Sequence, residues 1–589
     1  MDTLLSALDL ASVLSLLLAI IIGIGVGIIF GVLPGMGPLL GIALAIPFTF
    51  YMDPVPSIAL LMGIYQGGNF GGAVTAIMIG VPGTPMAAAT LLDGFPMARA
   101  GRVSDALVLA TLSSFAGALI SAVLLILLSP YLAAAAANFG PMETMLLAAL
   151  GLSTVASLTG KSLPRGLLAA ALGLSAAAIG TDPILGLPRM TMGLSGLDGG
   201  FNLVALLMGL FAVSELLTQV AEGEHLKAGR VRLQLRNGVL GNFLGRWTNW
   251  LRSSALGIFI GAIPGIGGDA SAYIAYRVSR DFSDEPEKFG QGADDGVVAS
   301  ESANSATTGG ALLPMLTIGI PGDPVVAALM GGFLIQGLTP GPQLFQQHPE
   351  IVYGVLAAFL LGALLLLPIA LVMLRALIRT LAVPKPYLIA AVGMFSVLGV
   401  FMVQRYMFDL WVFFAFGLIG YALRLAMIPL APLIIGYVLG STFEEELRMT
   451  SLVTGGDWVG FFLNRPASQI ILALLVLVLF TPIVQALLQR GAGSENLSQH
   501  FMQAVRYYRR WHLAHRNPAF VPWHTHACYM RYLQLGGRGK DAAWLRDWIY
   551  QMNDWLVSQM LQRAEEVAKE ANDAMHKVNR FMYFANGMP

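Results

Sequence analysis

Four polar side chains fall on one face of a predicted helix inside an apolar stretch of the chain. One is a carboxylate, one is an amide and two are hydroxyls: Glu301, Asn304, Ser305 and Thr308. Their spacing of i, i+3, i+4 and i+7 brings side chains to the same helix face. A carboxylate in an apolar segment is costly and usually functional, so these side chains are candidates for binding a small polar ligand. The alternative role for Glu301 is that of a helix cap, because a carboxylate in the first turn is stabilised by the helix dipole.

Two proline–glycine motifs occur once in each half of the chain. Gly31–Pro38 recurs as Gly261–Gly268, and Gly80–Pro85 recurs as Gly319–Pro324. Proline lacks an amide donor and glycine frees the backbone, so these motifs interrupt helices. Paired interruptions in the two halves of a membrane protein indicate a binding site where the ends of broken helices face a polar cavity. We expect the following glycines to border that site: Gly35, Gly37, Gly265, Gly267 and Gly322.

The composition excludes a water-soluble globular chain. Of the 589 residues, 56% are hydrophobic and only 12% are charged, which is typical of a protein that crosses a membrane several times. Several apolar stretches reach the roughly 20 residues that a helical span requires, whereas those near 38–50, 253–264 and 324–338 are short and predict re-entrant helices. The predicted fold is therefore an all-α polytopic membrane protein with broken helices. We expect it to contact the lipid bilayer and no nucleic acid.

The basic residues assign segments of the chain to the two sides of the membrane. No Lys or Arg precedes Arg99, and three basic clusters follow at 99–102, 161–165 and 227–252. The positive-inside rule places these clusters in the cytoplasm, which puts the N-terminus outside and the C-terminus inside. The first motif unit is then entered from outside and the second from inside. Two inverted-topology repeats of this kind build alternating-access carriers.

These patterns divide the chain into four parts. Residues 1–222 form the first transmembrane repeat, 223–252 a basic cytoplasmic linker, and 253–490 the second repeat. Residues 491–589 hold six of the eight His and five of the nine Trp and contain no apolar span, which predicts a small helical soluble tail of unknown role. Zinc binding by His524–Cys528 is an alternative, but that histidine spacing fits no closed zinc site. A fused enzyme is another, although the tail is short for a catalytic domain.

The glycine and proline motifs also resemble those of a known family, in the same order along the chain. In the first half they are Gly31–Pro38, Gly67–Gly72, Val81–Pro85 and Asp93–Met97. In the second half they are Gly290–Gly292, Gly296–Asn304, Gly309–Gly322 and Gly337–Pro342. Over residues 1–490 the chain resembles the large membrane subunit of the tripartite tricarboxylate transporters, the TctA-like family. The tail lies outside this resemblance.

The resemblance implies a secondary active transporter subunit that imports a carboxylate across the bacterial inner membrane. It implies coupling to a cation, either Na⁺ or H⁺, with no other cofactor and no enzymatic activity. It also implies two partners, a small four-span membrane subunit and a periplasmic solute-binding protein. The N-terminus is then periplasmic. A stand-alone carrier or exporter of the same fold remains an alternative, and a membrane-anchored enzyme that uses the tail is a further one.

The predicted site lacks the arginines that usually bind polycarboxylates. Backbone N–H groups at broken helix ends, hydroxyls, amides and a bound cation must then meet the anion. Asn69, between two glycine pairs, is taken as the nearest first-half counterpart of Glu301, with helix packing as its alternative role. Thr84 and Asp323 are candidate Na⁺ ligands, and Thr84 is also a candidate substrate contact. Asp323 stands where the family commonly has Ser or Thr, which adds negative charge at the site.

We expect a chain that ends near Gly491 to insert and transport as the full chain does, because both predicted repeats are complete before that residue. Uptake by the truncated chain in proteoliposomes, measured beside the full chain at equal protein, tests this expectation. A well-folded but inactive truncation would make the tail part of the mechanism.

Overall fold

The computed structural model describes residues 10–33, 36–153, 163–182, 186–222, 238–263, 267–380 and 385–476. They belong to one unit, Met1–Leu479. The predicted tail at 491–589, part of the predicted linker at 223–237, and the motif glycines Gly35 and Gly265 lie outside the described residues.

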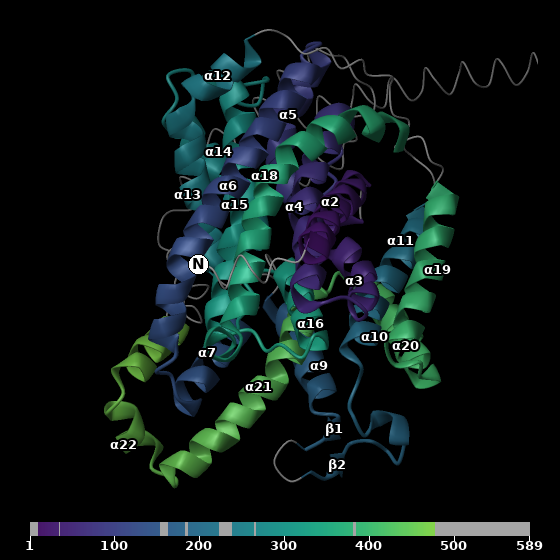
Figure 1. Cartoon of the computed structure of the whole chain (residues 1–589), viewed down its shortest axis with the longest axis vertical. Helices are drawn as coiled ribbons and strands as arrows, with labels where there is room; N and C mark the ends of the chain where they lie inside the picture. Colours follow the sequence, from purple (N-terminus) through teal and green to yellow (C-terminus); the bar gives the residue numbers. More distant parts are fainter. Residues whose placement is uncertain are drawn as a thin grey trace, which may run out of the picture. The chain divides into compact units, whose positions relative to one another are not determined.

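The prediction of an all-α polytopic membrane protein is confirmed (Figure 1). Among the described residues, the strands are the two-residue β1 (Gly180–Thr181) and β2 (Pro188–Arg189), which pair antiparallel. The helices of the first half are α2 (Leu10–Val32), α3 (Gly37–Thr49), α4 (Pro54–Ile79), η1 (Pro85–Ala87), α5 (Ala88–Arg99), α6 (Val103–Ala136), α7 (Pro141–Ser153), α9 (Leu163–Ala177), η2 (Ser195–Leu197), α10 (Leu203–Met208), η3 (Gly209–Val213) and α11 (Ser214–Glu222). Those of the second half are α12 (Val239–Gly245), α13 (Trp247–Ala262), α14 (Gly267–Asp281), η4 (Pro286–Lys288), α15 (Asp294–Ile318), α16 (Pro324–Ile335), α17 (Pro342–Gln347), α18 (Pro349–Thr380), α19 (Lys385–Gln404), α20 (Met407–Leu425), α21 (Ala431–Thr454) and α22 (Trp458–Leu463).

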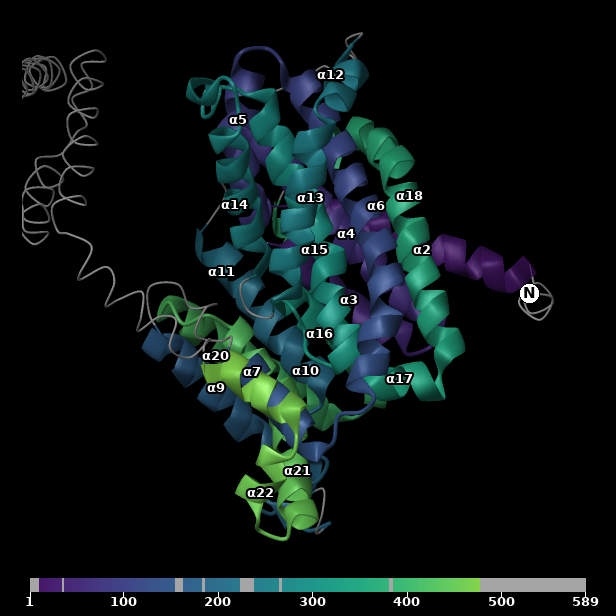
Figure 2. The same ribbon diagram turned by 90° about the vertical axis from the view of Figure 1, so that its left-hand side faces the viewer.

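Five of the described helices contain segments long and apolar enough to cross a membrane: Ser12–Val32, Val103–Ala136, Leu203–Ala221, Pro349–Leu374 and Met407–Leu425. Helices α4 and α15 are also long, at 26 and 25 residues, but they are rich in glycine and polar residues and are almost wholly buried. Polar side chains are costly against lipid, so these two helices belong in the interior. Figure 2 shows them in the middle of the bundle, with α6 and α18 beside them.

The two halves contain the same order of elements. In the first half, α2, α3 and α4 lead to a tip loop at 80–84 and then to η1 and α5. In the second half, α13, α14 and α15 lead to a tip loop at 319–323 and then to α16. Helix α4 ends at Gly80 with φ 73°, and α15 ends at Gly319 with φ 76°. This left-handed backbone favours glycine and stops each helix at the equivalent point.

Each tip loop folds back on the long helix that precedes it. The Gly83 N–H donates to the Gly72 carbonyl at 3.2 Å, and the Gly322 N–H donates to the Ala311 carbonyl at 3.3 Å. Both members of the second bond follow those of the first by 239 residues, the same offset that separates the two helix-ending glycines. The motif pairs therefore form the same local structure twice.

The long helices α4 and α15 run in opposite directions. Ser300, early in α15, contacts Thr90, which follows α4 in the chain. Tyr65, in the first half of α4, contacts Asp323, which follows α15. Each long helix thus begins beside the segment that follows the other. This arrangement agrees with the prediction of inverted-topology repeats.

Ion pairs gather the charged residues at two ends of the helical bundle. At one end Arg102 of α6 pairs with Asp294 of α15. At the other end, where β2 lies near the bottom of Figure 1, Arg189 of β2 pairs with Glu444 of α21. Its hydrogen bonds hold the pKa of the Glu444 carboxyl below its ordinary value. Each pair joins segments that the charge distribution assigns to the same side of the membrane. These two pairs therefore mark opposite ends of the bundle.

Candidate functional site

Helices α4 and α15 cross at their glycine-rich middle turns. Asn69 of α4 and Asn304 of α15 meet there, and the Asn304 Nδ2 group donates to the Asn69 carbonyl at 3.4 Å. Beside this crossing α3 packs closely on α4, because Gly68 lacks a side chain: a Cβ on Gly68 would lie 2.5 Å from the ring of Pro38, near the start of α3. Small residues at helix interfaces permit such contact in membranes. The crossing therefore brings the central turns of both repeats into one place.

Four side chains at this crossing are buried and carry polar atoms that have no hydrogen-bond partner among the described residues. We call them the polar cluster: Asn69, Thr84, Asn304 and Ser305. The unpartnered atoms are both polar side-chain atoms of Asn69, two hydroxyls and the Oδ1 atom of Asn304. Each buried polar group without a partner costs about 1–3 kcal/mol. Because native proteins pair nearly all such groups, several together make this crossing the candidate site.

Thr84 reaches the crossing from the first tip loop. A Cβ on Gly72, which is one turn after Asn69 on α4, would lie only 2.4 Å from the Thr84 Oγ1 atom. The Thr84 side chain is therefore packed against the glycine face of α4, close to the crossing.

Thr84 and Asp323 are equivalent positions of the two repeats, but their surroundings differ. Asp323 Oδ1 accepts a hydrogen bond from the Val326 N–H at 2.8 Å and so caps α16, while Oδ2 accepts one from the Tyr65 hydroxyl. The Thr84 hydroxyl neither caps η1 nor has another partner among the described residues. Both Asp323 oxygens thus already accept hydrogen bonds within the protein, whereas the Thr84 hydroxyl has no partner among the described residues.

Glu301 lies in the interior, away from the first turn of its helix. It is fully buried, and Asp294 and Asp295 occupy the first turn of α15, so the interpretation of Glu301 as a cap is wrong. Its Oε1 atom accepts a hydrogen bond from Thr90 of α5, and its Oε2 atom accepts one from Ser114 of α6 at 3.0 Å. The ion pairs at the start of α15 involve the two aspartates and not Glu301. Glu301 is therefore a buried carboxyl surrounded by neutral donors.

The remaining candidates from the sequence occupy structural positions around the crossing. The Thr308 hydroxyl donates to the Ser305 carbonyl in its own helix at 2.7 Å. Gly322 packs in the second tip loop against Ala311. Gly37 is the first residue of α3, where its φ of 57° favours glycine, and Gly267 is the first residue of α14. These glycines shape the backbone that holds the polar cluster.

Three residues of this region were not predicted from the sequence: Tyr65, Thr90 and Ser114. Tyr65 precedes Asn69 by four residues on α4, and this spacing is the signal that could have found it. Thr90 and Ser114 carry no comparable signal, because they lie 211 and 187 residues from their partner Glu301.

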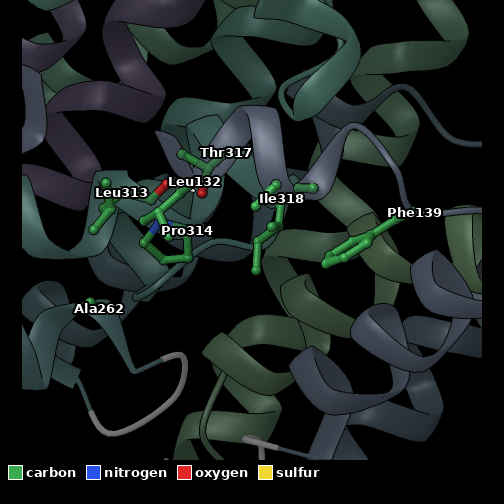
Figure 3. Close-up of a pocket in the computed structure, with 9 residues that line it drawn as sticks. Leu132, Phe139, Ala262, Leu313, Pro314, Thr317 and Ile318 are labelled. Carbon is green, nitrogen blue, oxygen red and sulfur yellow. Dashed lines mark hydrogen bonds between the residues drawn. The ribbon is translucent and has the colours of Figure 1, made fainter. Parts of the chain in front are cut away.

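An apolar pocket of about 270 Å³ also lies at the ends of α6 and α15 (Figure 3). Its lining residues are Leu132, Ala135, Ala136, Phe139, Ala262, Leu313, Pro314, Thr317 and Ile318. The Thr317 hydroxyl donates to the Leu313 carbonyl. The pocket thus offers no free hydroxyl, and a charged ligand is better matched by the polar cluster.

The polar cluster is closed to solvent in this conformation. None of its four residues is more than 4% exposed. A ligand can therefore enter or leave only if helices or tip loops move, as alternating access requires.

Residues 17–435 match the family described as "Tripartite tricarboxylate transporter TctA family". The chain belongs to this family. The resemblance that the motifs predict is confirmed, and the matched region contains both tip loops and the whole polar cluster. As a TctA family member with several apolar helices, the chain is a multi-pass membrane protein and a subunit of a tricarboxylate transporter.

Two relatives of this TctA family chain come from Agrobacterium vitis. One is described as "Uncharacterized 52.8 kDa protein in TAR-I ttuC' 3'region" and is 34% identical over 446 residues, which are 75% of this chain and 89% of the relative. The other is described as "Uncharacterized protein in TAR-II ttuC' 3'region" and is 34% identical over 215 residues, which are 36% of this chain and 89% of the relative. No solved structure matches the chain.

Proposed function

We propose that this chain is the membrane subunit through which a small carboxylate of the tricarboxylate type is imported into the bacterial cytoplasm together with a cation. The observation that supports this proposal is the polar cluster, where the two inverted repeats cross and five buried polar atoms lack partners among the described residues. Binding sites of inverted-repeat carriers lie at such crossings of broken helices.

The chemistry of the polar cluster suits an anion that binds together with a cation. The Asn69 amide and the hydroxyls of Thr84 and Ser305 can donate to carboxylate oxygens. The ion pairs described for the chain lie outside the crossing, so no guanidinium fork balances the substrate there. A co-bound cation supplies the missing positive charge in this mechanism, which makes coupled uptake of the two the natural outcome.

Thr84 and Asp323 are the proposed Na⁺ ligands. The buried Thr84 hydroxyl has no other partner among the described residues, and a hydroxyl oxygen is a suitable Na⁺ ligand. Each Asp323 oxygen already accepts one hydrogen bond but keeps a further lone pair for a cation. The donor set therefore fits a small monovalent cation held by oxygen atoms.

The direction and the partners follow from the tripartite system to which the family belongs. We place the N-terminus in the periplasm and the C-terminus in the cytoplasm of the bacterial inner membrane, as the basic clusters predict. A periplasmic solute-binding protein then delivers the carboxylate, and a small four-span subunit completes the membrane complex. A stand-alone carrier or exporter of the same fold is the competing function, and it would need neither partner.

Uptake in proteoliposomes tests the proposal. The chain, alone and with the two partners, is supplied with a panel of carboxylates that includes citrate, with and without an inward Na⁺ gradient. We expect uptake only when the partners are present and faster uptake with the gradient. Because linkage is reciprocal, Na⁺ should raise substrate affinity by the same factor as substrate raises Na⁺ affinity. Uptake by the chain alone would favour the stand-alone carrier.

Variants at Asp323 test the cation site. Asp323→Ser should keep transport but change its Na⁺ dependence, and Asp323→Lys should stop uptake because the ammonium repels the cation. The matched control is Asp457→Ser. Asp457 is also an aspartate that caps a helix, but that helix is α22 and the cap is exposed. Substrate binding that is equal with and without Na⁺ would contradict the proposed Na⁺ site.

A further inference from the structure

The hydrogen bonds around Glu301 form a chain of hydroxyls. Thr90 Oγ1 contacts Glu301 Oε1 and also lies 2.9 Å from Ser300 Oγ, and either hydroxyl of that pair can be the donor. Ser300 Oγ in turn donates to the Gly296 carbonyl at 2.9 Å. A second hydroxyl, that of Ser114, reaches the other carboxylate oxygen. Two hydroxyls thus connect the carboxyl to a backbone carbonyl of α15, and a third binds its other oxygen.

This chain satisfies both protonation states of the carboxyl. With Glu301 ionised, the Thr90 hydroxyl donates to Oε1. With Glu301 neutral, the acid proton on Oε1 points to Thr90 Oγ1, the Thr90 hydroxyl turns to Ser300, and Ser300 keeps its bond to the Gly296 carbonyl. Hydroxyls rotate to suit either role. Each hydroxyl in this series of hydrogen bonds keeps a partner whether Glu301 is protonated or ionised. Neither state therefore carries the free-energy cost of an unpaired buried polar atom.

We propose that Glu301 is a reversible proton-binding site, with Thr90, Ser300 and Ser114 as the hydroxyls that hold it in both states, and that its protonation is coupled to carboxylate movement. The proton binding stands on this geometry alone, whereas its coupling to transport rests on the proposed function. Acquisition of the proton makes the carboxyl neutral, which removes a negative charge one helical turn from Asn304 and so favours an anionic substrate at the polar cluster.

The other charged groups near this part of α15 are already engaged with one another. Asp93 of α5 accepts the N–H groups of Gly290 and Gly292 at 2.8 Å. The groups that face the first turns of α15 from the elements packed on it are Asp93 of α5, Arg102 and Asp105 of α6, Arg246 and Arg252 near the start of α13, Tyr276 of α14, and Asp294 and Asp295 of α15 itself. From α4 the described titratable group is Tyr65, which contacts Asp323. Glu301 is therefore separate from the ion-pair network.

The other buried glutamates of the described chain show what a structural glutamate looks like. Glu143 pairs with Arg465 at 2.8 Å, and Glu215 pairs with Arg424. Each of them has a guanidinium partner. Glu301 has neutral partners in place of a cation: hydroxyls of α5 and α6 and the Asn304 amide of its own helix. The α4 and α16 groups contact Asp323 instead.

Infrared difference spectroscopy of the full-length protein in lipid tests the proton site without knowledge of the substrate. The carbonyl stretch of a buried carboxylic acid should grow as the pH falls, and Glu301→Gln should remove one component of it. The matched control Glu143→Gln should leave that component in place, because the Glu143 carboxylate is ion-paired. Identical titrations of the wild type and Glu301→Gln would overturn the proposal.

Variants at Thr90 test the hydroxyl chain. Thr90→Val removes the donor to the ionised carboxylate, so the acid band should titrate about one pH unit higher, the size expected for one hydrogen bond to a charged group. Thr90→Ser keeps a hydroxyl and should restore the original titration. A titration that is the same in Thr90→Val and the wild type would show that the hydroxyl chain does not hold the proton.

Transport measurements test the coupling separately. In Glu301→Gln, carboxylate uptake driven by a pH gradient should fall to the rate seen without a gradient, and exchange of internal for external substrate should fall much less. A direct substrate contact would instead lower both rates together, and gradient-driven uptake that persists in Glu301→Gln would overturn the coupling. If the wild type moves no member of the carboxylate panel, the proposed function fails while the infrared titration still decides the proton site.

Discussion

Gly83→Ala is expected to abolish transport and to lower the thermal stability of the protein. A Cβ at this position would lie 2.0 Å from the Gly31 carbonyl oxygen of α2 and 3.0 Å from the Gly72 Cα of α4. Both contacts are with backbone, so no flexible side chain can move aside. Overpacking of this kind costs about 1–3 kcal/mol or more. The tip loop that carries Thr84 must shift to relieve it, and the polar cluster is then displaced.

Gly322→Ala should have the same effect in the second repeat. Its Cβ would lie 2.6 Å from the Ala311 Cα and 2.7 Å from the Gly261 carbonyl oxygen. Neither Gly83 nor Gly322 has a positive φ, so the cost of the substitution is steric and not conformational. Equal losses at the two positions would show that both repeats depend on the same close contact.

Gly25→Ala is the matched control for these substitutions. It lies within α2, where a Cβ would meet no atom within 4 Å, and alanine favours a helix interior over glycine by about 1 kcal/mol. This variant should transport normally and melt at the wild-type temperature or above. Melting curves in detergent and uptake in proteoliposomes report the two quantities. Wild-type stability and uptake in Gly83→Ala would contradict the close packing of the tip loop.

The repeated architecture could be predicted because its signals are local. Closely spaced proline and glycine residues interrupt a helix through their own backbone properties. Gly80–Pro85 and Gly319–Pro324 therefore predict the tip loops without knowledge of the tertiary structure. The polar face of α15 was equally local, because helical spacing places Glu301, Asn304, Ser305 and Thr308 on the same side of the helix. The polar cluster consists of four residues that the sequence had singled out, and all are buried in the structure.

The wrong prediction and the missed contacts both depend on which distant segments of the chain lie together. Asn69 was taken as the counterpart of Glu301, but the 239-residue offset of the tip loops makes Asn69 equivalent to Thr308 and Met62 equivalent to Glu301. Composition cannot show which residues of the two repeats are equivalent. The backbone hydrogen bonds of the tip loops show it. The role of Asp323 as the cap of α16 and acceptor of the Tyr65 hydroxyl is likewise a tertiary contact.

The difference between the two half-sites also has consequences for binding. Inverted repeats with identical sequences would form two equivalent sites, but both Asp323 oxygens accept hydrogen bonds within the protein, while the Thr84 hydroxyl has no partner among the described residues. One carboxylate per chain is therefore the expected stoichiometry. The sequence difference between threonine and aspartate at equivalent positions thus gives a symmetric fold an asymmetric site.

Asn69→Ala is expected to weaken carboxylate binding by about 10- to 100-fold, since hydrogen bonds to a charged group contribute about 1.5–3 kcal/mol. The same variant should melt at or above the wild-type temperature when no substrate is present. Both polar atoms of the Asn69 side chain lack partners among the described residues, so the empty protein carries their desolvation cost. Substrate titrations of the melting temperature measure affinity and stability in one experiment.

The opposite signs of these two effects separate a ligand contact from a packing residue. An asparagine that held helices together by a side-chain hydrogen bond would lower the melting temperature of the empty protein when replaced, and would change substrate affinity little. Asn138→Ala is the control, because Asn138 is exposed and its amide donates only to a carbonyl of its own turn, that of Ala134. A lower melting temperature of Asn69→Ala with unchanged substrate affinity would show that Asn69 is a packing residue. Loss of affinity with retained stability would instead show that the free energy of the unpartnered cluster is released when the carboxylate binds.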